Sequence, residues 1–311
     1  MFTDGRKRQP ACKNDGGLVK KAIRTPSGVA IIGPGRLGQA MGRLLAESHV
    51  RIAFVAARKL DAARRAVKFI GRGKPLALAD PRVPRASVIL LTTLDSALAG
   101  VARDLASRPG STTGWTGKVV LHTCGSLPSA VLRPLELRGA AIGSLHPYQT
   151  VPSPQAGVRN LRNCFWAIEG DPAALRVARE LVRRLGGVAF LIKPEQKTLY
   201  HLSAFLTCPT VVTLMAQAAD LLKLAGVPPR VAWPMLRQFV RETADNFAEM
   251  GGPRALTGPA VRGDWATVRR HLAALRHSAP AFVPVYQSLL RAMLRLAGQQ
   301  KAGRRVLHAS R

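Results

Sequence analysis

From Gly28 onward, short apolar runs alternate with longer helix-like stretches, and this alternation constrains the fold more than any other feature of the sequence. The runs VAIIG, RIAFVAA, SVILLTT, KVVLHTC and AAIGSLH are each followed or separated by segments with helical patterning. Strands that are apolar on both faces and separated by helices are typical of a parallel sheet covered on each side. The sequence therefore predicts a doubly wound α/β domain.

The remainder of the chain changes character at Pro194. Before it, CFWAIEG, a helix-like segment and GVAFLIK form a further β-α-β unit that we expect to continue the same sheet. After it, strand signals stop, and long helices are predicted over 197–224, 230–249, 265–275 and 280–296. The first is apolar nearly all round, which favours a helix buried on several sides, at a domain or subunit interface.

A glycine-spaced turn links the first predicted strand to the first predicted helix. Gly33, Gly35 and Gly38 form a GxGxxG pattern in which the first glycine permits the turn, the second admits a pyrophosphate and the third allows close packing. The free N–H groups and the helix dipole point at the phosphates. The context predicts a Rossmann-type dinucleotide site rather than a purely structural turn, with these cofactor-binding residues: Gly33, Pro34, Gly35, Arg36, Leu37 and Gly38.

The end of the second strand bears on the choice between NAD and NADP. No carboxylate precedes Asp61 there, and Arg58 and Lys59 stand in its place. A guanidinium matches a 2′-phosphate in charge and geometry, so we expect NADP(H). The alternative is that both residues belong to a solvated helix start.

Further candidates follow the third, fourth and fifth strands, because ligands bind at the carboxyl edge of such sheets. Thr92, Thr93 and Leu94 are expected to face the cofactor. A histidine at this edge can donate a proton to a carbonyl or orient a substrate. We weigh this role for His146 against a backbone-capping one, and we favour capping for His122.

Lys197 and His201 lie four residues apart, on one face at the start of the long apolar helix. A lysine at a cleft can stabilise an anion or act as a general acid, which makes Lys197 the first candidate for proton donor. The structural alternatives are a snorkelling lysine and a core histidine. The chain has no HExxH, GxSxG or P-loop motif, so hydrolase and kinase chemistry are not supported.

The net charge of +30, from 47 basic and 17 acidic residues, raises the question of nucleic-acid binding. The basic residues are spread along the chain, aromatic residues make up 5%, and the two are not interleaved. We therefore favour a solvated arginine-rich surface and keep nucleic-acid binding as an alternative.

The four cysteines lie far apart without a CxxC pair, so we expect free thiols and no metal. With no secretory h-region and no continuous apolar run of bilayer length, we expect a cytoplasmic protein without a membrane span.

Six segments also carry a family resemblance: GPGRLGQAMG, LTTLD, HTCGS, GSLHPYQT, KTLYH and LTGPAVRGDWATVRRHL. Over about residues 28–300 the chain resembles the family that combines a Rossmann-like domain with the domain of unknown function DUF2520. The resemblance implies an NADP oxidoreductase similar in architecture to pyrroline-5-carboxylate reductase, ketopantoate reductase and the 6-phosphogluconate dehydrogenase group. It also implies a helical domain that often forms a dimer.

The resemblance maps the second-domain signature to Lys197, Tyr200 and His201. Where it implies a Ser-Asn pair, this chain has Cys208-Pro209, and a proline is expected to kink the helix.

The sequence as a whole predicts four segments: a disordered basic tail at 1–27, a dinucleotide-binding domain at 28–193, a helical substrate and dimerisation domain at 194–300, and a basic tail at 301–311.

These features together predict an NADP(H)-dependent oxidoreductase. It would move a hydride to or from a C=O or C=N carbon of a small, anionic substrate. The alternative is a non-catalytic NADP(H)-binding sensor or regulatory protein, motivated by Pro209.

Overall fold

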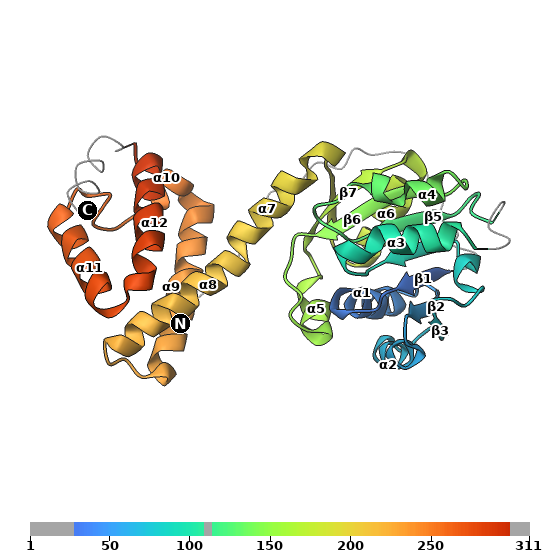
Figure 1. Cartoon of the computed structure of the whole chain (residues 1–311), viewed down its shortest axis with the longest axis horizontal. Helices are drawn as coiled ribbons and strands as arrows, with labels where there is room; N and C mark the ends of the chain where they lie inside the picture. Colours follow the sequence, from blue (N-terminus) through green and yellow to red (C-terminus); the bar gives the residue numbers. More distant parts are fainter. Residues whose placement is uncertain (1–27, 109–113, 299–311) are drawn as a thin grey trace, which may run out of the picture. The chain divides into compact units, whose positions relative to one another are not determined.

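The structure is a computed structural model that describes residues 28–108 and 114–298. The chain divides into two compact units, Met1–Ala204 and Phe205–Arg311, each described by itself below (Figure 1). The predicted tails at 1–27 and 301–311 lie outside the described residues. The division falls inside the helix that starts at Lys197, eleven residues after the boundary expected from sequence at 193.

The first unit is an eight-stranded sheet with helices on both faces, as the sequence predicted. The strand order is β3-β2-β1-β4-β5-β6-β7-β8. The strands are β1 (Val29–Ile32), β2 (Ile52–Ala57), β3 (Lys74–Ala77), β4 (Val88–Leu91), β5 (Val119–His122), β6 (Ala141–Pro147), β7 (Phe165–Gly170) and β8 (Val188–Leu191). The helices that pack on them are α1 (Arg36–Glu47), α2 (Leu60–Ile70), α3 (Asp95–Ala106), α4 (Arg133–Glu136), α5 (Pro154–Asn160) and α6 (Pro172–Arg184).

Two apolar cores lie on opposite faces of this sheet because neighbouring strand residues point to opposite sides. In β1, Val29 and Ile31 join the core under α1, α2 and α6, whereas Ala30 and Ile32 join the core under α3 and α4. All four residues of β1 are buried. This two-sided burial explains why the central strands read as continuous apolar runs.

Two features of the sheet were not anticipated. The predicted β-α-β unit does continue the sheet, but β7 runs antiparallel to β6, and β8 is parallel to β7. An edge strand, β3, pairs with β2 although it is only four residues long and contains Pro75. Proline lacks a ladder donor and is tolerated at sheet edges, so the pattern KPLA gives little strand signal.

The second unit is helical, as expected. Its helices are α8 (Pro209–Leu224), α9 (Pro229–Met250), α10 (Gly252–Ala255), α11 (Trp265–Ser278) and α12 (Val283–Leu296). Asp264 caps α11 by accepting a hydrogen bond from the Thr267 N–H at 3.1 Å. A small core of Val268, Leu272 and Leu290 joins α11 to α12.

The long apolar helix is broken at Cys208 into α7 (Lys197–Thr207) and α8. Pro209 occupies the first turn of α8, where its missing N–H costs no helical hydrogen bond. Apart from Lys197, no side chain of α7 or α8 is buried, so the covered helix expected from sequence is not covered within the chain. Taken together, the helical segment Pro194–Leu224, which contains α7 and α8, is the one among the described residues that is long and apolar enough to cross a membrane, by length and composition only.

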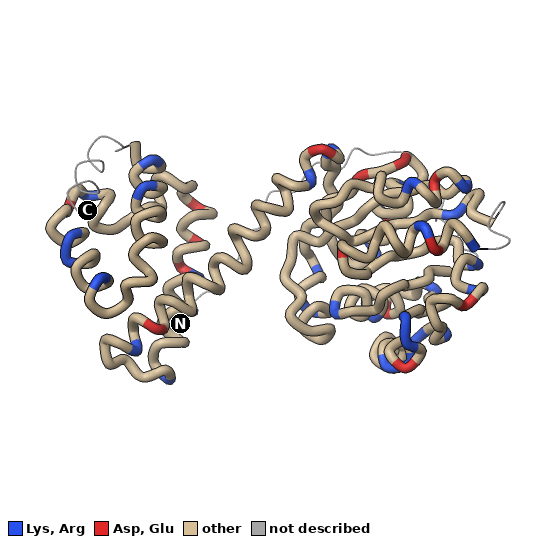
Figure 2. The backbone as a smooth tube through the Cα atoms, viewed as in Figure 1, with Lys and Arg blue, Asp and Glu red and all other residues tan. Residues whose placement is uncertain are grey.

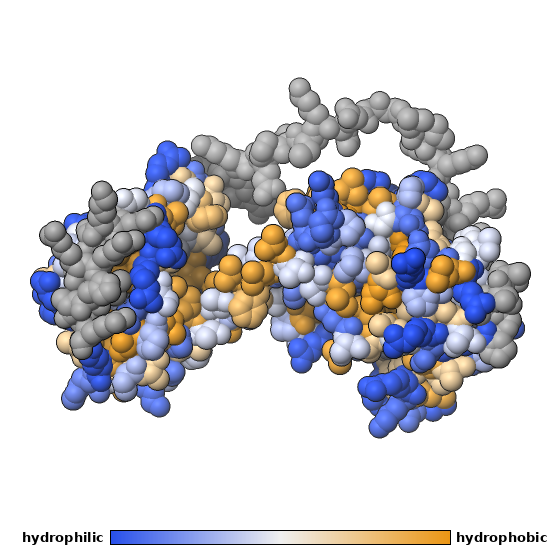
Figure 3. Space-filling model, turned by 45° about the horizontal axis from the view of Figure 1, so that its top comes forward, coloured by the Kyte–Doolittle hydropathy of each residue, from blue (hydrophilic) through white to orange (hydrophobic). Residues whose placement is uncertain are grey.

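Lysine and arginine positions are distributed along the backbone of both units rather than gathered on one element (Figure 2). In the space-filling view, hydrophilic side chains cover much of the visible surface, with apolar ones between them (Figure 3). Several arginines pair locally, such as Arg183 and Arg184 with Glu180 in α6.

Candidate functional site

The glycine turn has the geometry that its spacing predicted, with a different role for each glycine. Gly33 has φ +75°, and a methyl group added to it would collide with the Thr93 side chain. A methyl group on Gly38 would collide with the Thr92 hydroxyl, which donates to the Gly33 carbonyl at 2.8 Å. Gly35 faces open space, since only the Gly33 carbonyl lies within 4 Å of an added methyl group. The turn therefore packs tightly beneath and leaves its outer side free.

A cavity of about 770 Å³ opens beside this turn, at the carboxyl edge of β1, β2 and β4. Eight of the eleven residues predicted to bind the cofactor line it: Gly33, Pro34, Gly35, Arg58, Lys59, Thr92, Thr93 and Leu94. Arg36, Leu37 and Gly38 do not line the cavity. They form the first turn of α1, which starts at Arg36 without a side-chain cap and so keeps its first N–H groups available.

The lining of this cavity fits a phosphorylated dinucleotide. Arg58 and Lys59 are exposed at the end of β2, and none of the described lining residues is acidic. The Thr93 hydroxyl is buried and has no hydrogen-bond partner among the described residues. Buried polar groups are nearly always hydrogen-bonded, so this hydroxyl is available to a ligand.

The two histidines of the carboxyl edge differ in environment. His122 is fully buried, and its Nδ1 accepts a hydrogen bond from the Cys124 N–H at 3.1 Å, which confirms the capping interpretation. Burial and, to a smaller extent, the Lys197 charge lower the pKa of His122 to about 3. Burial, then the neighbouring His201 and Lys197, lower the pKa of His146 to about 3. Both rings are therefore neutral at physiological pH.

His146 forms the centre of a cluster with the start of α7. Its Nδ1 lies 2.9 Å from the Tyr200 hydroxyl, and its ring is edge-on to that of His201 at a centroid distance of 5.6 Å. Tyr148 and Phe190 pack against the Tyr200 ring. Burial raises the pKa of Tyr200, so the phenol keeps its proton. The structure thus places Tyr200 and His201, both on α7, against His146.

Lys197 lies beneath this cluster and not at the mouth of a cleft. Its side chain is 1% exposed, and Nζ donates to Ser144 Oγ at 2.6 Å and to the Cys124 carbonyl at 3.0 Å. A third neighbour, Glu169 Oε1, lies 3.6 Å away. The ammonium therefore makes two hydrogen bonds and one ion pair, all to buried groups. Burial lowers the pKa of Lys197, and Glu169 opposes that shift.

Glu169 and its two serine partners were not predicted from the sequence. Glu169 is 3% exposed and accepts hydrogen bonds from the Ser129 N–H and hydroxyl, both at 2.8 Å, and from the Ser144 hydroxyl at 2.6 Å. A single acidic residue inside the apolar run CFWAIEG was the available signal. Buried carboxylates are rare unless they are paired, so such a residue implies a partner.

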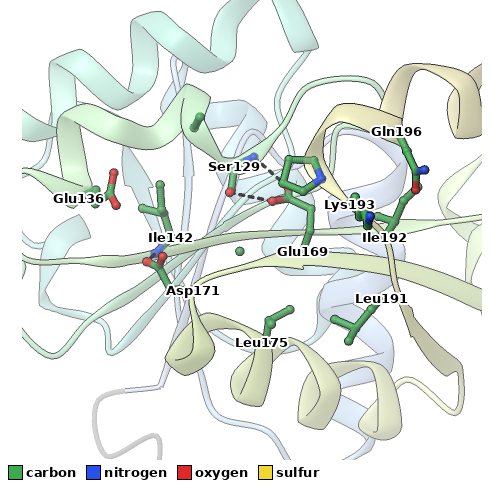
Figure 4. Close-up of a pocket in the computed structure, with 13 residues that line it drawn as sticks. Ser129, Glu136, Ile142, Glu169, Asp171, Leu175, Leu191, Ile192, Lys193 and Gln196 are labelled. Carbon is green, nitrogen blue, oxygen red and sulfur yellow. Dashed lines mark hydrogen bonds between the residues drawn. The ribbon is translucent and has the colours of Figure 1, made fainter.

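Glu169 also borders a second, shallower groove of about 780 Å³, shown in Figure 4. Glu136 and Asp171 lie toward one end of it, and Lys193 and Gln196 toward the other. Asp171 is already engaged, because it accepts the Ile142 N–H at 2.7 Å. Among the described residues, no group of three or more His, Cys, Asp or Glu side chains is placed to hold a metal ion.

The fold and the glycine turn define a Rossmann-like α/β protein with a helical C-terminal part. Comparison with protein families agrees: residues 13–147 match the Rossmann-like domain, and residues 164–293 match the domain of unknown function DUF2520. The chain therefore carries a Rossmann-like domain followed by a DUF2520 domain, which confirms the resemblance drawn from its motifs. The second match begins within the sheet, just before β7.

Solved structures share this architecture over nearly the whole chain. A Bacteroides fragilis protein provisionally named as an NADP oxidoreductase is 26% identical with a TM-score of 0.70, and the match covers 85% of this chain and 96% of that one. The Aspergillus terreus reductive aminase, solved with NADPH and ethyl levulinate, is 17% identical with a TM-score of 0.64, covering 92% and 99%.

A more distant match has the same extent. The Plasmodium falciparum pyrroline carboxylate reductase, solved with NADP bound, is 11% identical with a TM-score of 0.58, covering 90% of this chain and 99% of that one. No curated protein matches the chain significantly. The fold is thus that of NADP-dependent reductases.

Proposed function

We propose that the chain is an NADP(H)-dependent oxidoreductase that transfers a hydride to or from a C=O or C=N carbon of a small substrate. The observation that carries this proposal is the cavity at the glycine turn, which has Arg58 and Lys59 at its rim and no acidic lining residue among those described. The Bacteroides fragilis relative, provisionally an NADP oxidoreductase, and the NADPH-bound reductive aminase support it.

The cofactor roles follow from the chemistry of each residue. The open side of Gly35 and the first turn of α1 would hold the pyrophosphate, because free N–H groups and the helix dipole attract anions. Arg58 and Lys59 would hold the 2′-phosphate, and Thr93 would donate its unpaired hydroxyl to the cofactor. When bound, NADPH supplies the hydride, and the protein supplies orientation and a proton.

We assign the proton to the Tyr200 hydroxyl. In the neutral tautomer that carries its hydrogen on Nδ1, His146 donates to the Tyr200 oxygen across their 2.9 Å contact. The phenol hydrogen, which otherwise points to the His146 carbonyl at 3.3 Å, can then pass to a substrate. Lys197 was the first candidate from sequence, but its side chain is 1% exposed and its ammonium is held by Ser144 and the Cys124 carbonyl, with Glu169 beside it. We therefore propose that Lys197 supports the site from below. The expectation of an anionic substrate rested on a free ammonium, so the proposal does not specify the substrate's charge.

Replacing Arg58 by alanine is expected to weaken NADPH binding at least about tenfold and NADH binding little, because one charge-assisted contact to the 2′-phosphate is lost. Calorimetric titration of both cofactors measures this. Arg65→Ala is the matched control, since Arg65 is also an exposed arginine, in the middle of α2, but lies outside the cavity. Equal binding of NADPH and NADH by the wild type would contradict the NADP(H) assignment.

Tyr200→Phe is expected to lower turnover about 100-fold or more with unchanged NADPH affinity, the usual range for a general acid. The substrate comes from a screen of ketones, keto acids, aldehydes and imines for NADPH consumption. Tyr286→Phe is the matched control, because Tyr286 pairs with His271 at 3.1 Å in the second unit. Full activity of Tyr200→Phe would remove this residue from the mechanism. Tight NADPH binding with no turnover on any compound would favour the non-catalytic sensor.

We also propose that the protein partners a second copy of itself through α7, α8 and α9. Large apolar side chains are exposed on these helices, including Val212, Phe239 and Phe247, which are 62–71% exposed. Monomers rarely expose such extensive apolar surface, which marks interfaces. Burial of this surface against a second copy would explain why the apolar side chains of Pro194–Leu224 are exposed in the single chain, without a membrane. Because the basic residues are distributed over both units, they do not form a dedicated nucleic-acid-binding element, and we do not propose nucleic-acid binding.

A further inference from the structure

A buried carboxylate on β7 is connected to the candidate active site through a chain of hydrogen bonds. Glu169 lies directly opposite Ser144 in the pairing of β6 with β7. Its Oε1 accepts the Ser144 hydroxyl at 2.6 Å. Two further bonds, from the Ser129 N–H and hydroxyl, hold the carboxylate in place (Figure 4). With all its contacts internal, Glu169 has no part in the hydride or proton transfer proposed above.

The second link of the chain is Lys197. Ser144 donates to Glu169 and accepts from Lys197 Nζ at 2.6 Å, so its single hydroxyl joins the two charges. The side chains of Glu169 and Lys197 are 3% and 1% exposed. A buried ammonium needs a nearby opposite charge, and Glu169 lies closest, at 3.6 Å.

The third link runs from Lys197 to the imidazole rings. Nζ donates to the Cys124 carbonyl at 3.0 Å, and Gly125 follows in the chain. A methyl group added to Gly125 would lie 2.5 Å from His201 Cδ2 and 2.8 Å from His146 Nε2. Both rings therefore rest directly on the backbone that Lys197 holds. Lys197 also lies one helical turn before His201, so it fixes the start of α7 as well.

We propose that Glu169 is a positioning residue of the active site: through Ser144 and Lys197 it fixes the Cys124-Gly125 turn and the start of α7, and thereby the rings of His146 and His201. The carboxylate keeps the buried ammonium charged and aimed at the Cys124 carbonyl. Without it, Nζ loses the group that orients it, and the backbone beneath the two rings is released.

The test follows the rings directly, by NMR of histidine labelled with ¹³C and ¹⁵N in the full chain. Glu169→Gln is expected to shift the ring signals of both His146 and His201 by more than a linewidth. The ring signal of His271 serves as an internal control and should not shift. His271 forms a similar pair with Tyr286, but it lies in the second unit and is not bonded to Glu169, Ser144 or Lys197. Glu136→Gln is the matched control, since Glu136 lines the same groove but has no hydrogen bond to this chain of residues.

A second variant keeps the test decisive if Glu169→Gln does not fold. Ser144→Ala retains both charges and removes only the connecting hydroxyl, and it is expected to shift the same two rings. Glu169→Asp, which keeps the charge, should restore the wild-type positions at least in part. A variant that lowers the melting temperature but leaves both rings at their wild-type shifts would overturn the proposal, since a purely structural role predicts that result.

The ring measurement does not depend on the proposed reductase function. An effect on turnover does rest on that function, so it is tested by a separate kinetic measurement. With a substrate in hand, Glu169→Gln should lower kcat at least tenfold and leave the Kd for NADPH unchanged. Unchanged kcat together with shifted rings would refute a catalytic consequence of positioning. Failure of NADPH to bind the wild type would refute the proposed function and leave the ring measurement unaffected.

Discussion

Gly35→Ala is expected to weaken NADPH binding at least roughly 100-fold, about 2.7 kcal/mol, while the melting temperature stays within a degree of wild type. Gly35 is the one glycine of the turn whose added methyl group meets no side chain. Its φ of −71° is also ordinary for alanine. The methyl group would therefore cost the folded protein little and would occupy the space through which a pyrophosphate approaches the backbone.

The other two glycines of the motif serve as controls with the opposite signature. Gly33→Ala combines a positive φ with a collision against Thr93, and Gly38→Ala collides with the Thr92 hydroxyl. Both are expected to lower the melting temperature clearly. The comparison uses calorimetric titration for binding and differential scanning calorimetry for stability. If Gly35→Ala bound NADPH as tightly as wild type, the turn would be a structural feature only, and the proposed NADP(H)-dependent function would be refuted.

The sequence predicted the first unit well because its strongest signals are local. Apolar runs, helix-like spacings and the glycine pattern each lie within a few residues, and parallel strands bring their carboxyl ends to one edge. This is why eight of the eleven predicted cofactor residues line a single cavity. The reversed direction of β7 was not accessible in this way, since a strand buried on both faces reads the same in either direction.

The candidate catalytic residues were harder to assign, because their environment depends on contacts distant in sequence. From sequence alone, Lys197 is indistinguishable from a substrate-binding lysine. In the structure its ammonium is buried because it is hydrogen-bonded to Ser144, 53 residues earlier, and to the Cys124 carbonyl, 73 residues earlier. No local pattern encodes such a pocket. The lone Glu169 in an apolar strand was the one local sign that a buried cation had to lie nearby.

Acidification is expected to destabilise the first unit steeply, because His122 and His146 are buried in the neutral form. The pKa of each lies at about 3 in the folded protein, against 6.5 for an ordinary histidine. Between these values the unfolded chain binds more protons than the native one, so stability falls as the pH falls. From pH 7 to pH 5 each histidine is expected to remove about 2 kcal/mol of unfolding free energy.

Denaturant titration at several pH values measures this slope. Trp233→Phe with Trp265→Phe restricts the fluorescence signal to Trp115 and Trp166, both buried in the first unit. In that background His146→Gln should halve the pH dependence, since glutamine does not titrate and can still bond to Tyr200.

His277→Gln, at an exposed position of α11, should leave the slope of the first unit unchanged. A free energy of unfolding that stays constant from pH 7 to pH 5 in the parent protein would show that the two rings take up protons in the native state. The assignment of both rings as neutral at physiological pH would then be wrong.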